Sequence, residues 1–230
     1  MIASLKQIMK YWNTIHTIYK QKKTFFLGFG LYFLFAILML LFIGNNEISK
    51  ITNDISYPIL DFIFFYLTYL GDGLITLAFL IIIFFYRISL GLVSMFSILI
   101  PSLVTQLLKR FCFFNSKRPG IVFKDLIHNK DWHIVDGVDL HSYMSFPSGH
   151  TTAVFSICCI SILLIRNEFY HIPVLLIAIL TGFSRIYLSQ HFLIDVTVGS
   201  IIGCLGTFLL YSAFRDKFNS LEFSLFKNFK

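Results

Sequence analysis

Charged residues are scarce in this sequence. Of its 230 residues, 13% are Asp, Glu, Lys or Arg and 57% are hydrophobic, whereas a soluble domain is about one quarter charged. The composition therefore excludes an ordinary soluble protein and predicts an integral membrane protein. The sequence also contains no internal repeat and no segment that reads as a separate soluble domain.

Cysteine is sparse as well. The four cysteines show neither the spacing of metal ligands nor a disulfide framework. Three of them lie within apolar runs, where cysteine usually behaves as a small hydrophobic residue. The cysteines therefore give no sign of a metal site; they are Cys112, Cys158, Cys159 and Cys204.

Acidic residues are fewer than basic ones. The 12 Asp and Glu against 19 Lys and Arg leave a net charge of +7, but basic residues near membrane ends set orientation and contact anionic lipid. We therefore expect membrane lipids as partners, no nucleic acid and no obligate protein partner. A cleavable signal peptide is not expected, because the first apolar run is long and no small-residue cleavage pattern follows it.

The apolar stretches predict an all-α integral membrane protein with six transmembrane helices. A helix needs about 20 apolar residues to cross the hydrocarbon core. The second stretch is divided by Gly71-Asp72-Gly73, so its helix begins before the glycines or follows a separate interfacial segment. Asp61 and Asp72 are expected near the interface as helix-start residues. The six stretches are 25–43, 57–86, 88–108, 151–165, 171–188 and 191–211.

Two basic segments flank the six-helix domain, which is expected at residues 24–214. Residues 1–23 place apolar side chains at helical spacing with lysines around them, which favours an amphipathic helix on the cytoplasmic membrane surface over a solvated helix. Residues 215–230 are basic again and are expected to form a cytoplasmic tail.

The basic residues also predict the orientation. With six spans, the N-terminal lysines, Arg87, Arg166 and the C-terminal basic residues fall on one side, which the positive-inside rule makes cytoplasmic. Residues 45–56, 111–146 and 184–190 then lie together on the exoplasmic side. We expect a bacterial inner (cytoplasmic) membrane, with these segments facing the periplasm or exterior.

The connection at 111–146 is long enough to be functional or disordered. It carries three histidines and several aspartates, which suggests metal ligands, but the spacing fits no compact metal site. Surface loop residues are the favoured interpretation. The histidines are His128, His133 and His141.

A histidine and an aspartate stand four residues apart at the last apolar stretch. On a helix, His191 and Asp195 share one face, so the carboxylate can accept a hydrogen bond from one imidazole nitrogen and leave the other free as a nucleophile. Arg185 lies upstream, where its guanidinium could hold a phosphate or carboxylate. For an isolated pair, a helix cap or staple would be the better interpretation.

Two further motifs accompany this pair. Pro147-Ser148-Gly149-His150 opens the fourth apolar stretch, and Arg118-Pro119 stands further upstream. In this order the chain resembles the type-2 phosphatidic acid phosphatase superfamily, which groups membrane lipid phosphatases with vanadium haloperoxidases. That family carries Lys-x6-Arg-Pro, Pro-Ser-Gly-His and Ser-Arg-x5-His-x3-Asp. The second and third motifs match in full, and the resemblance covers roughly residues 60–215.

The first motif is irregular. Phe111 stands where the family has lysine, seven residues before Arg118. Lys109 and Arg110 are the nearest basic residues; they lie about a hundred degrees apart around a helix, so only one should face the site. Lys109 is slightly favoured by residue type, whereas Arg110 is closer by spacing. Pro119 should hold Arg118 in extended geometry.

The resemblance implies phosphatase chemistry through a phosphohistidine, with no metal and no cofactor. His191 would be the nucleophile, Asp195 would orient it, and His150 would act as general acid and then general base. The other residues would hold the phosphate of the substrate. These are Arg118, Arg185, Ser148, Gly149 and either Lys109 or Arg110.

The expected function is hydrolysis of a lipid phosphate or diphosphate, with the active site on the exoplasmic side. Family substrates include phosphatidylglycerol phosphate, phosphatidic acid, undecaprenyl diphosphate and lipid A phosphate, and nothing in the sequence chooses among them. A lipid phosphotransferase with the same site and a non-catalytic lipid-binding membrane protein are the alternatives. Six apolar stretches argue against a haloperoxidase.

Overall fold

The structure, a computed structural model, describes residues 2–218, with side chains from residue 8 onward. Within that range the chain is helical and contains no strand. The helices, including two 3-10 turns (η1, η3) and a π-helical turn (η2), are α1 (Ile2–Gln21), α2 (Lys23–Phe42), α3 (Asn45–Asp54), α4 (Pro58–Leu67), η1 (Thr68–Gly71), α5 (Gly73–Tyr86), α6 (Ile88–Leu107), η2 (Leu108–Cys112), α7 (Pro119–Val122), α8 (Lys124–His128), α9 (Gly149–Leu164), η3 (Glu168–Tyr170), α10 (His171–Tyr187) and α11 (Leu193–Phe218).

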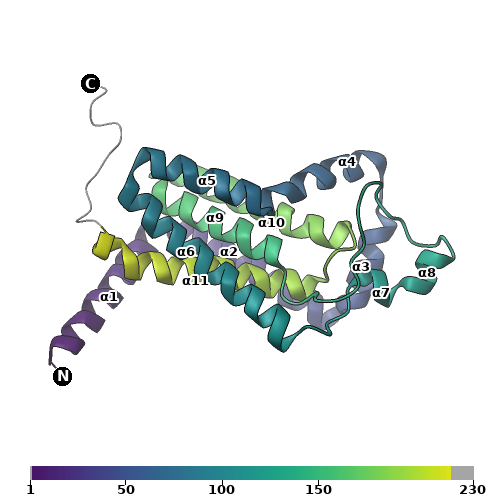
Figure 1. Ribbon diagram of the computed structural model, residues 1–230, viewed down its shortest axis with the longest axis horizontal. Helices are drawn as coiled ribbons and strands as arrows, with labels where there is room; N and C mark the ends of the chain where they lie inside the picture. The colour runs from purple at the N-terminus through teal and green to yellow at the C-terminus, as the bar shows by residue number, and fades with distance from the viewer. Residues whose placement is uncertain (1, 219–230) are drawn as a thin grey trace.

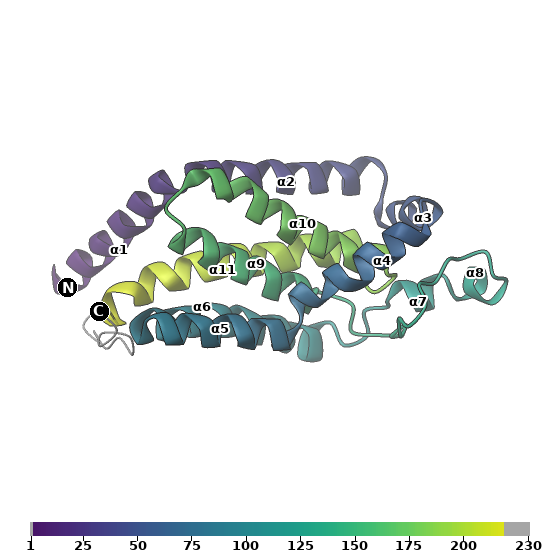
Figure 2. The ribbon, with the colours of Figure 1, turned by 90° about the horizontal axis from the view of Figure 1, so that it is seen from above.

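Helices α9 and α11 lie at the centre of the bundle. α6 packs against both of them, α5 packs against α6, and α10 packs against α9. Figure 2 shows the layers that result, with α2 and α10 on one side of the central pair and α5 and α6 on the other. Helix α1 leaves the bundle at one end, and α3, α4, α7 and α8 gather at the opposite end (Figure 1). We call this opposite end the loop end.

Four helical segments are long and apolar enough to cross a membrane: 23–42, 88–112, 168–187 and 193–218. The segments 58–71 and 73–86 make a fifth if the two halves, bent by 53°, form one span. Helix α9 has 16 residues and is about 24 Å long at 1.5 Å per residue, short of the roughly 30 Å core. The described residues therefore contain four or five candidate spans, and the count of six stays a prediction.

The second apolar stretch is broken at the glycines, as expected. Asp72 is extended, with φ −78° and ψ 153°, between η1 and α5. Its side chain caps α5 by accepting a hydrogen bond from the Leu74 amide at 3.0 Å, because a carboxylate oxygen can satisfy an unpaired amide at a helix N-terminus. Asp61 lies in the first turn of α4. Both aspartates are therefore helix-start residues, as predicted.

Two segments differ from the sequence prediction. Residues 45–56, expected as a connection, contain helix α3, whose Ile48 and Thr52 are buried; one apolar face is enough to dock a short helix on the bundle. At the other end α11 continues to Phe218, so Arg215 and Lys217 are in its last turn rather than in a separate tail. Residues 219–230 lie outside the described residues.

Helix α1 carries the features on which the surface-helix prediction rests. Ile8, Met9 and Trp12 are exposed, and the Lys10 ammonium lies 2.9 Å from a carboxylate oxygen of Asp216 in α11. Exposed apolar side chains beside lysines are typical of a helix at a membrane interface. Its contact with the membrane stays a prediction.

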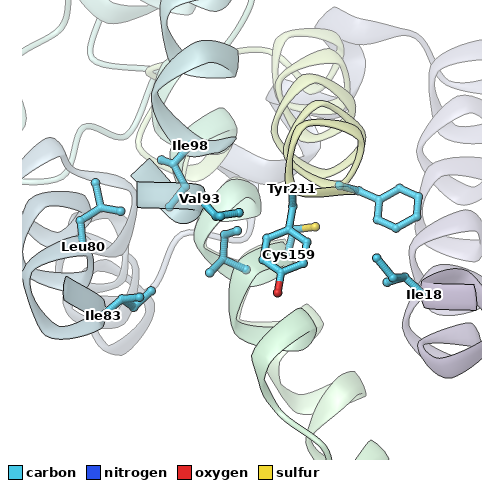
Figure 3. Packing of buried hydrophobic residues seen from close by; sticks show 9 residues of the cluster. Ile18, Leu80, Ile83, Val93, Ile98, Cys159 and Tyr211 are labelled. Carbon is cyan, nitrogen blue, oxygen red and sulfur yellow. The ribbon is translucent and has the colours of Figure 1, made fainter. Parts of the chain in front are cut away.

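The apolar core joins five helices. Figure 3 shows one cluster in which side chains from α5 and α6 face those from α9, α11 and α1. Cys159 is part of this cluster, and Cys158 and Cys204 are buried in the neighbouring one, which confirms that these cysteines act as small hydrophobic residues. The labelled residues are Ile18, Leu80, Ile83, Val93, Ile98, Cys159 and Tyr211.

Candidate active site

A cavity of about 640 Å³ opens beside α5, α6 and α9 and reaches the loop end. Its polar part lies where the C-terminal ends of α6 and α10 meet the N-terminal ends of α9 and α11. Segments far apart in the sequence therefore contribute to one site. The charged and imidazole side chains lining it are Lys109, Arg118, His141, His150, Arg185 and His191.

His191 lies in the turn between α10 and α11, not on a helix as the sequence analysis expected. Helix α10 ends in a Schellman motif, in which Ser189 takes the left-handed φ of 54°. The Gln190 amide donates to the Arg185 carbonyl at 2.9 Å, and the Ser189 amide donates to the Ile186 carbonyl at 3.0 Å. These bonds fix the backbone immediately before His191.

Asp195 contacts His191 in spite of that difference. Its Oδ2 lies 3.3 Å from His191 Nδ1, and both side chains are buried. The same oxygen accepts a hydrogen bond from the Phe192 amide at 2.9 Å, so the carboxylate also caps α11, where a negative charge is favoured by the helix dipole. Because Nδ1 faces Asp195, the Nε2 atom of His191 is left for a ligand.

Ser145 completes this group, and the sequence analysis did not identify it. Its hydroxyl donates to Asp195 Oδ2 at 2.5 Å and lies 3.5 Å from His191 Nδ1. Ser145 is fully enclosed, with 1% of its surface exposed. The only signal in the sequence is its place two residues before Pro147; the contact itself depends on how the long connection folds back onto α11.

The surroundings of His191 favour a neutral imidazole. Burial lowers the pKa of His191 well below its usual value, and the nearby positive charges of Arg118, Arg185 and Lys109 act in the same direction. A neutral imidazole has a lone pair at Nε2 at ordinary pH. His191 is therefore suited to act as a nucleophile rather than as a cation.

Arg118 is buried and held by backbone carbonyls. Its φ of −91° and ψ of 164° are extended, as the proline that follows predicts. Nε donates to the Tyr143 carbonyl at 3.0 Å, and Nη1 donates to the Gln190 carbonyl at 3.0 Å. These bonds fix the guanidinium between the long connection and the turn that carries His191.

Arg185 approaches the cavity from the end of α10. Its Nη1 donates to Thr68 Oγ1 of η1 at 2.6 Å, while its buried Nε has no hydrogen-bond partner. A buried guanidinium donor left unpaired is costly unless an acceptor occupies the site. The arrangement therefore fits an anion. Thr68, which was not predicted, serves as the anchor.

Of the two candidates for the first motif, the structure places Lys109 in the cavity. Lys109 is buried and Arg110 is exposed and absent from the cavity wall, which agrees with the slightly favoured alternative. The reason is the π-helical turn η2 at the end of α6, which sets the direction of each side chain. No residue pattern in the sequence predicts this π-helical turn, so the spacing alone could not decide whether Lys109 or Arg110 faces the cavity. The contact of Lys109 with phosphate stays a prediction.

The Pro-Ser-Gly-His segment forms the start of α9, as expected for a helix opening. Gly149 and His150 line the cavity, but the Ser148 side chain does not. Instead, Ser148 Oγ caps the helix by accepting hydrogen bonds from the Thr151 amide at 3.4 Å and the Thr151 hydroxyl at 2.9 Å. In this structure Ser148 caps the helix that carries His150, and its contact with substrate stays a prediction.

His150 is held against the break between α4 and α5. A Cβ atom built on Gly71 would lie 2.7 Å from the His150 carbonyl oxygen and 2.9 Å from its Cβ. Only glycine fits so close an approach. The glycine at the end of η1 therefore allows the break in the second apolar stretch to form part of the site.

The long connection at 111–146 forms the outer wall of the site. Trp132 stacks on Phe123 with ring centroids 4.2 Å apart, and its indole donates to Ser189 Oγ at 2.9 Å. Gln190 Nε2 donates to the Asp139 carbonyl at 2.7 Å. The connection thus holds the turn that carries His191 and is more than a surface loop.

The histidines of this connection do not form a metal site. Among the residues that the structure describes, no three His, Cys, Asp or Glu side chains are grouped so that they could hold a metal ion. His133 contacts Asp61 through Nε2 at 3.0 Å. His141 borders the cavity, and His128 ends α8.

A buried His–Asp pair borders a cavity with three cationic side chains, in a bundle of apolar helices long enough to cross a membrane. Residues 90–219 match the family model of the PAP2 superfamily. The match covers more than half of the chain, and the chain belongs to this superfamily. Its apolar helices and membrane relatives make it an integral membrane protein.

Curated relatives are named as lipid phosphatases. Phosphatidylglycerophosphatase B of Bacillus subtilis (strain 168) is 28% identical over 179 residues, 76% of this chain and 84% of that protein. Undecaprenyl-diphosphatase BcrC of the same strain is 38% identical over 72 residues, 31% of this chain, and the match spans only 36% of that protein. Lipid A 4'-phosphatase of Porphyromonas gingivalis is 32% identical over 69 residues, 30% of this chain and 29% of that protein.

Two solved structures share the fold. The crystal structure of Aquifex aeolicus LpxE superimposes with a TM-score of 0.62 and 28% identity, over 72% of this chain and 93% of that one. The PAP2-type phosphatidylglycerolphosphate phosphatase from Bacillus subtilis gives a TM-score of 0.61 and 28% identity, over 86% of this chain and 97% of that one.

Proposed function

We propose that this protein hydrolyses a lipid phosphate or diphosphate through a phosphohistidine intermediate. The observation that carries the proposal is the His191–Asp195 pair, which borders the same cavity as three buried or nearly buried cations. Such a cavity lacks its counter-charge until an anion enters. The cations are Lys109, Arg118 and Arg185.

The charge of the cavity and its apolar lining both favour the phosphate group of a lipid. Gathering three cations in a poorly hydrated cavity is unfavourable unless a multiply charged anion neutralises them. A phosphate group offers several oxygens that guanidinium donors can bind. Away from the charged groups, the cavity wall between α5 and α6 is mostly apolar, which suits the hydrocarbon part of a lipid.

In the first step His191 Nε2 attacks phosphorus in line with the leaving oxygen. The P–O bond breaks as the P–N bond forms, and the imidazolium form of His150 gives its proton to the leaving oxygen and becomes neutral. Asp195 accepts the Nδ1–H hydrogen bond and stabilises the imidazole as it becomes positive. The cations hold the equatorial oxygens of the transferring group.

In the second step water replaces His191 on phosphorus. His150, now neutral, takes a proton from the attacking water, the P–N bond breaks, and inorganic phosphate leaves with His191 neutral again. The chain's own groups thus account for every proton. The N-terminus of α9 adds a favourable dipole near the phosphate.

The proposal includes six spans with the loop end on the exoplasmic side. Its support is the position of Arg87, Arg166 and Arg215, which follow or end apolar helices and all lie away from the loop end. Outside labelling by a membrane-impermeant thiol reagent tests it, in a background with Cys112 replaced by Ser. A cysteine at the exposed Ser142 should react, and one at the exposed Lys20 should not; the reverse pattern overturns the orientation.

The direct test of the function is phosphate release in detergent with EDTA present. Phosphatidylglycerol phosphate is the first substrate to test, because Phosphatidylglycerophosphatase B of Bacillus subtilis matches this chain over 84% of its own length. The other substrates to test are phosphatidic acid, undecaprenyl diphosphate and lipid A phosphates. Release by the wild type, and none by His191→Ala, supports the proposal. Transfer of the phosphoryl group only when a second lipid is present would identify a phosphotransferase. If no substrate releases phosphate, a non-catalytic lipid-binding protein is the remaining alternative.

A further inference from the structure

The cavity has an apolar arm that phosphate chemistry does not use. From the charged groups it continues between α5 and α6, with one wall from α9. Leu77, Leu80 and Ile81 line it on α5, and Leu99 lines it on α6. Leu77, Ile81 and Leu99 are each about half exposed, so the arm is open along its side toward the lipid.

The arm ends where α5 and α6 converge. The two helices are joined at Arg87 and run back along each other (Figure 2). A Cβ atom built on Gly91 would lie 2.5 Å from the Phe84 ring and 2.9 Å from the Phe84 Cα, so no side chain separates the helices there. Phe84 and Met95 are the last residues to line the cavity on each helix. The hairpin is therefore closed at Phe84 and open toward His150.

We propose that this arm holds one hydrocarbon chain of the substrate, and that the contact of Phe84 with Gly91 limits how many of its carbons the arm can hold. The inference rests on the proposed function, because the phosphate of the same lipid would bind among the cations. It adds a determinant of specificity that the catalytic residues do not supply.

The length of the arm follows from helix geometry. From Gly73, level with the charged groups, to Phe84 the helix α5 rises about 16 Å at 1.5 Å per residue, close to half of the roughly 30 Å hydrocarbon core. An extended chain advances about 1.2 Å per single bond. The arm therefore accommodates about a dozen carbons of an extended chain, and the carbons of a longer chain have to leave through the open side.

The arm should discriminate between hydrocarbon chains by how well they pack in it, not by their hydrophobicity. A lipid tail is as apolar in the bilayer as in the protein, so moving it into the arm gains little from the hydrophobic effect. What distinguishes chains is the packing they make with the walls and the strain of bending a tail that reaches the closed end. Substitutions in the arm should therefore act differently on short and long chains.

Two adjacent isoleucines of α5 provide a matched test. Ile81 lines the arm, while Ile82 does not and is more exposed. With single-chain lipid phosphates of about six to eighteen carbons, kcat/KM of the wild type should rise with length and level off near a dozen carbons. Ile81→Trp should lower kcat/KM at least fivefold for a sixteen-carbon substrate and less than twofold for a six-carbon one. Ile82→Trp should change neither.

A second variant tests the closed end of the arm by a gain of activity on longer chains. Phe84→Ala should move the plateau to longer chains, a result that a damaged fold does not produce. Equal effects of Ile81→Trp and Ile82→Trp, or equal losses on short and long chains, would overturn the inference.

If no substrate is hydrolysed, the proposed function fails while the arm remains testable. An alkylphosphonate of about twelve carbons with a terminal diazirine then serves as the probe. Cross-linking at Ile81, Phe84 or Met95 supports the arm. Labelling spread over the lipid-facing surface rejects it.

Discussion

Two histidine–aspartate pairs lie at the loop end of the molecule. In one, His191 Nδ1 is 3.3 Å from Asp195, with side chains 2% and 3% exposed. In the other, His133 Nε2 is 3.0 Å from Asp61, with side chains 38% and 21% exposed. The shorter pair is the one in contact with solvent. Contact distance therefore does not tell which pair belongs to a reactive site.

The surroundings distinguish the two pairs. His191 is buried and borders the cavity with Arg118 and Arg185. Asp61 is engaged by the Tyr187 hydroxyl at 2.5 Å, and His133 does not border the cavity. The second pair ties the long connection to α4 and α10. The same two residue types thus border the cavity in one place and attach a connection to helices in the other.

The largest expected difference is between His191→Ala and His133→Ala. The first should reduce phosphate release to below about one-thousandth of wild type, because the nucleophile is lost. The second should stay within about threefold. Release from a lipid phosphate in detergent measures both. Comparable losses in the two variants would show that the buried pair has no special role.

Lys109→Ala and Arg110→Ala should also differ. Loss of a cation that contacts phosphate costs about 1.5–3 kcal/mol of transition-state binding, or roughly 10- to 150-fold in kcat/KM. Arg110 is exposed outside the cavity, so its loss should change kcat/KM less than twofold. Steady-state kinetics on the two purified variants decides. Equal effects would place the phosphate away from Lys109.

Ser145→Ala should weaken the buried pair without removing it. Asp195 loses one of the donors to Oδ2, a hydrogen bond to a charged group, and kcat should fall about tenfold with KM nearly unchanged. Ser145→Thr keeps the hydroxyl and should restore part of kcat. Ser161→Ala, at the far end of α9, serves as the control. A rise in KM alone would mean that Ser145 acts on substrate binding instead.

The smallest expected effect is the change with pH in the rate at which His191 is chemically modified. Its pKa is lowered by burial and by the nearby cations, so the neutral, reactive form persists as the pH falls below the usual value. Between pH 7 and pH 6, modification of His191 by diethylpyrocarbonate should stay nearly constant, whereas a solvent-exposed histidine with an ordinary pKa of about 6.5 would slow about threefold. Mass spectrometry of the His191 peptide reports the rate. A threefold decrease would contradict the shift.

The site was predictable where it depended on residue type and order. His150, His191, Asp195, Arg118 and Arg185 were named from motifs, and the structure brings all five to one place. Ser148 was placed correctly at a helix start, while its contact with substrate stays a prediction. A hydroxyl at that position can cap or bind substrate, and the sequence does not distinguish these two uses.

The sequence by itself determined the class of protein, because runs of apolar residues select membrane helices and the glycines around Asp72 break one of them locally. What only the tertiary structure decided depends on helix phase and long-range packing. The π-helical turn directs Lys109 inward, the fold of the long connection brings Ser145 to Asp195, and the approach of α5 to α6 closes the apolar arm. The first sets the rotation of a helix end, the second joins groups distant in sequence, and the third is the close packing of two consecutive helices; none of these is encoded in the local pattern of residues.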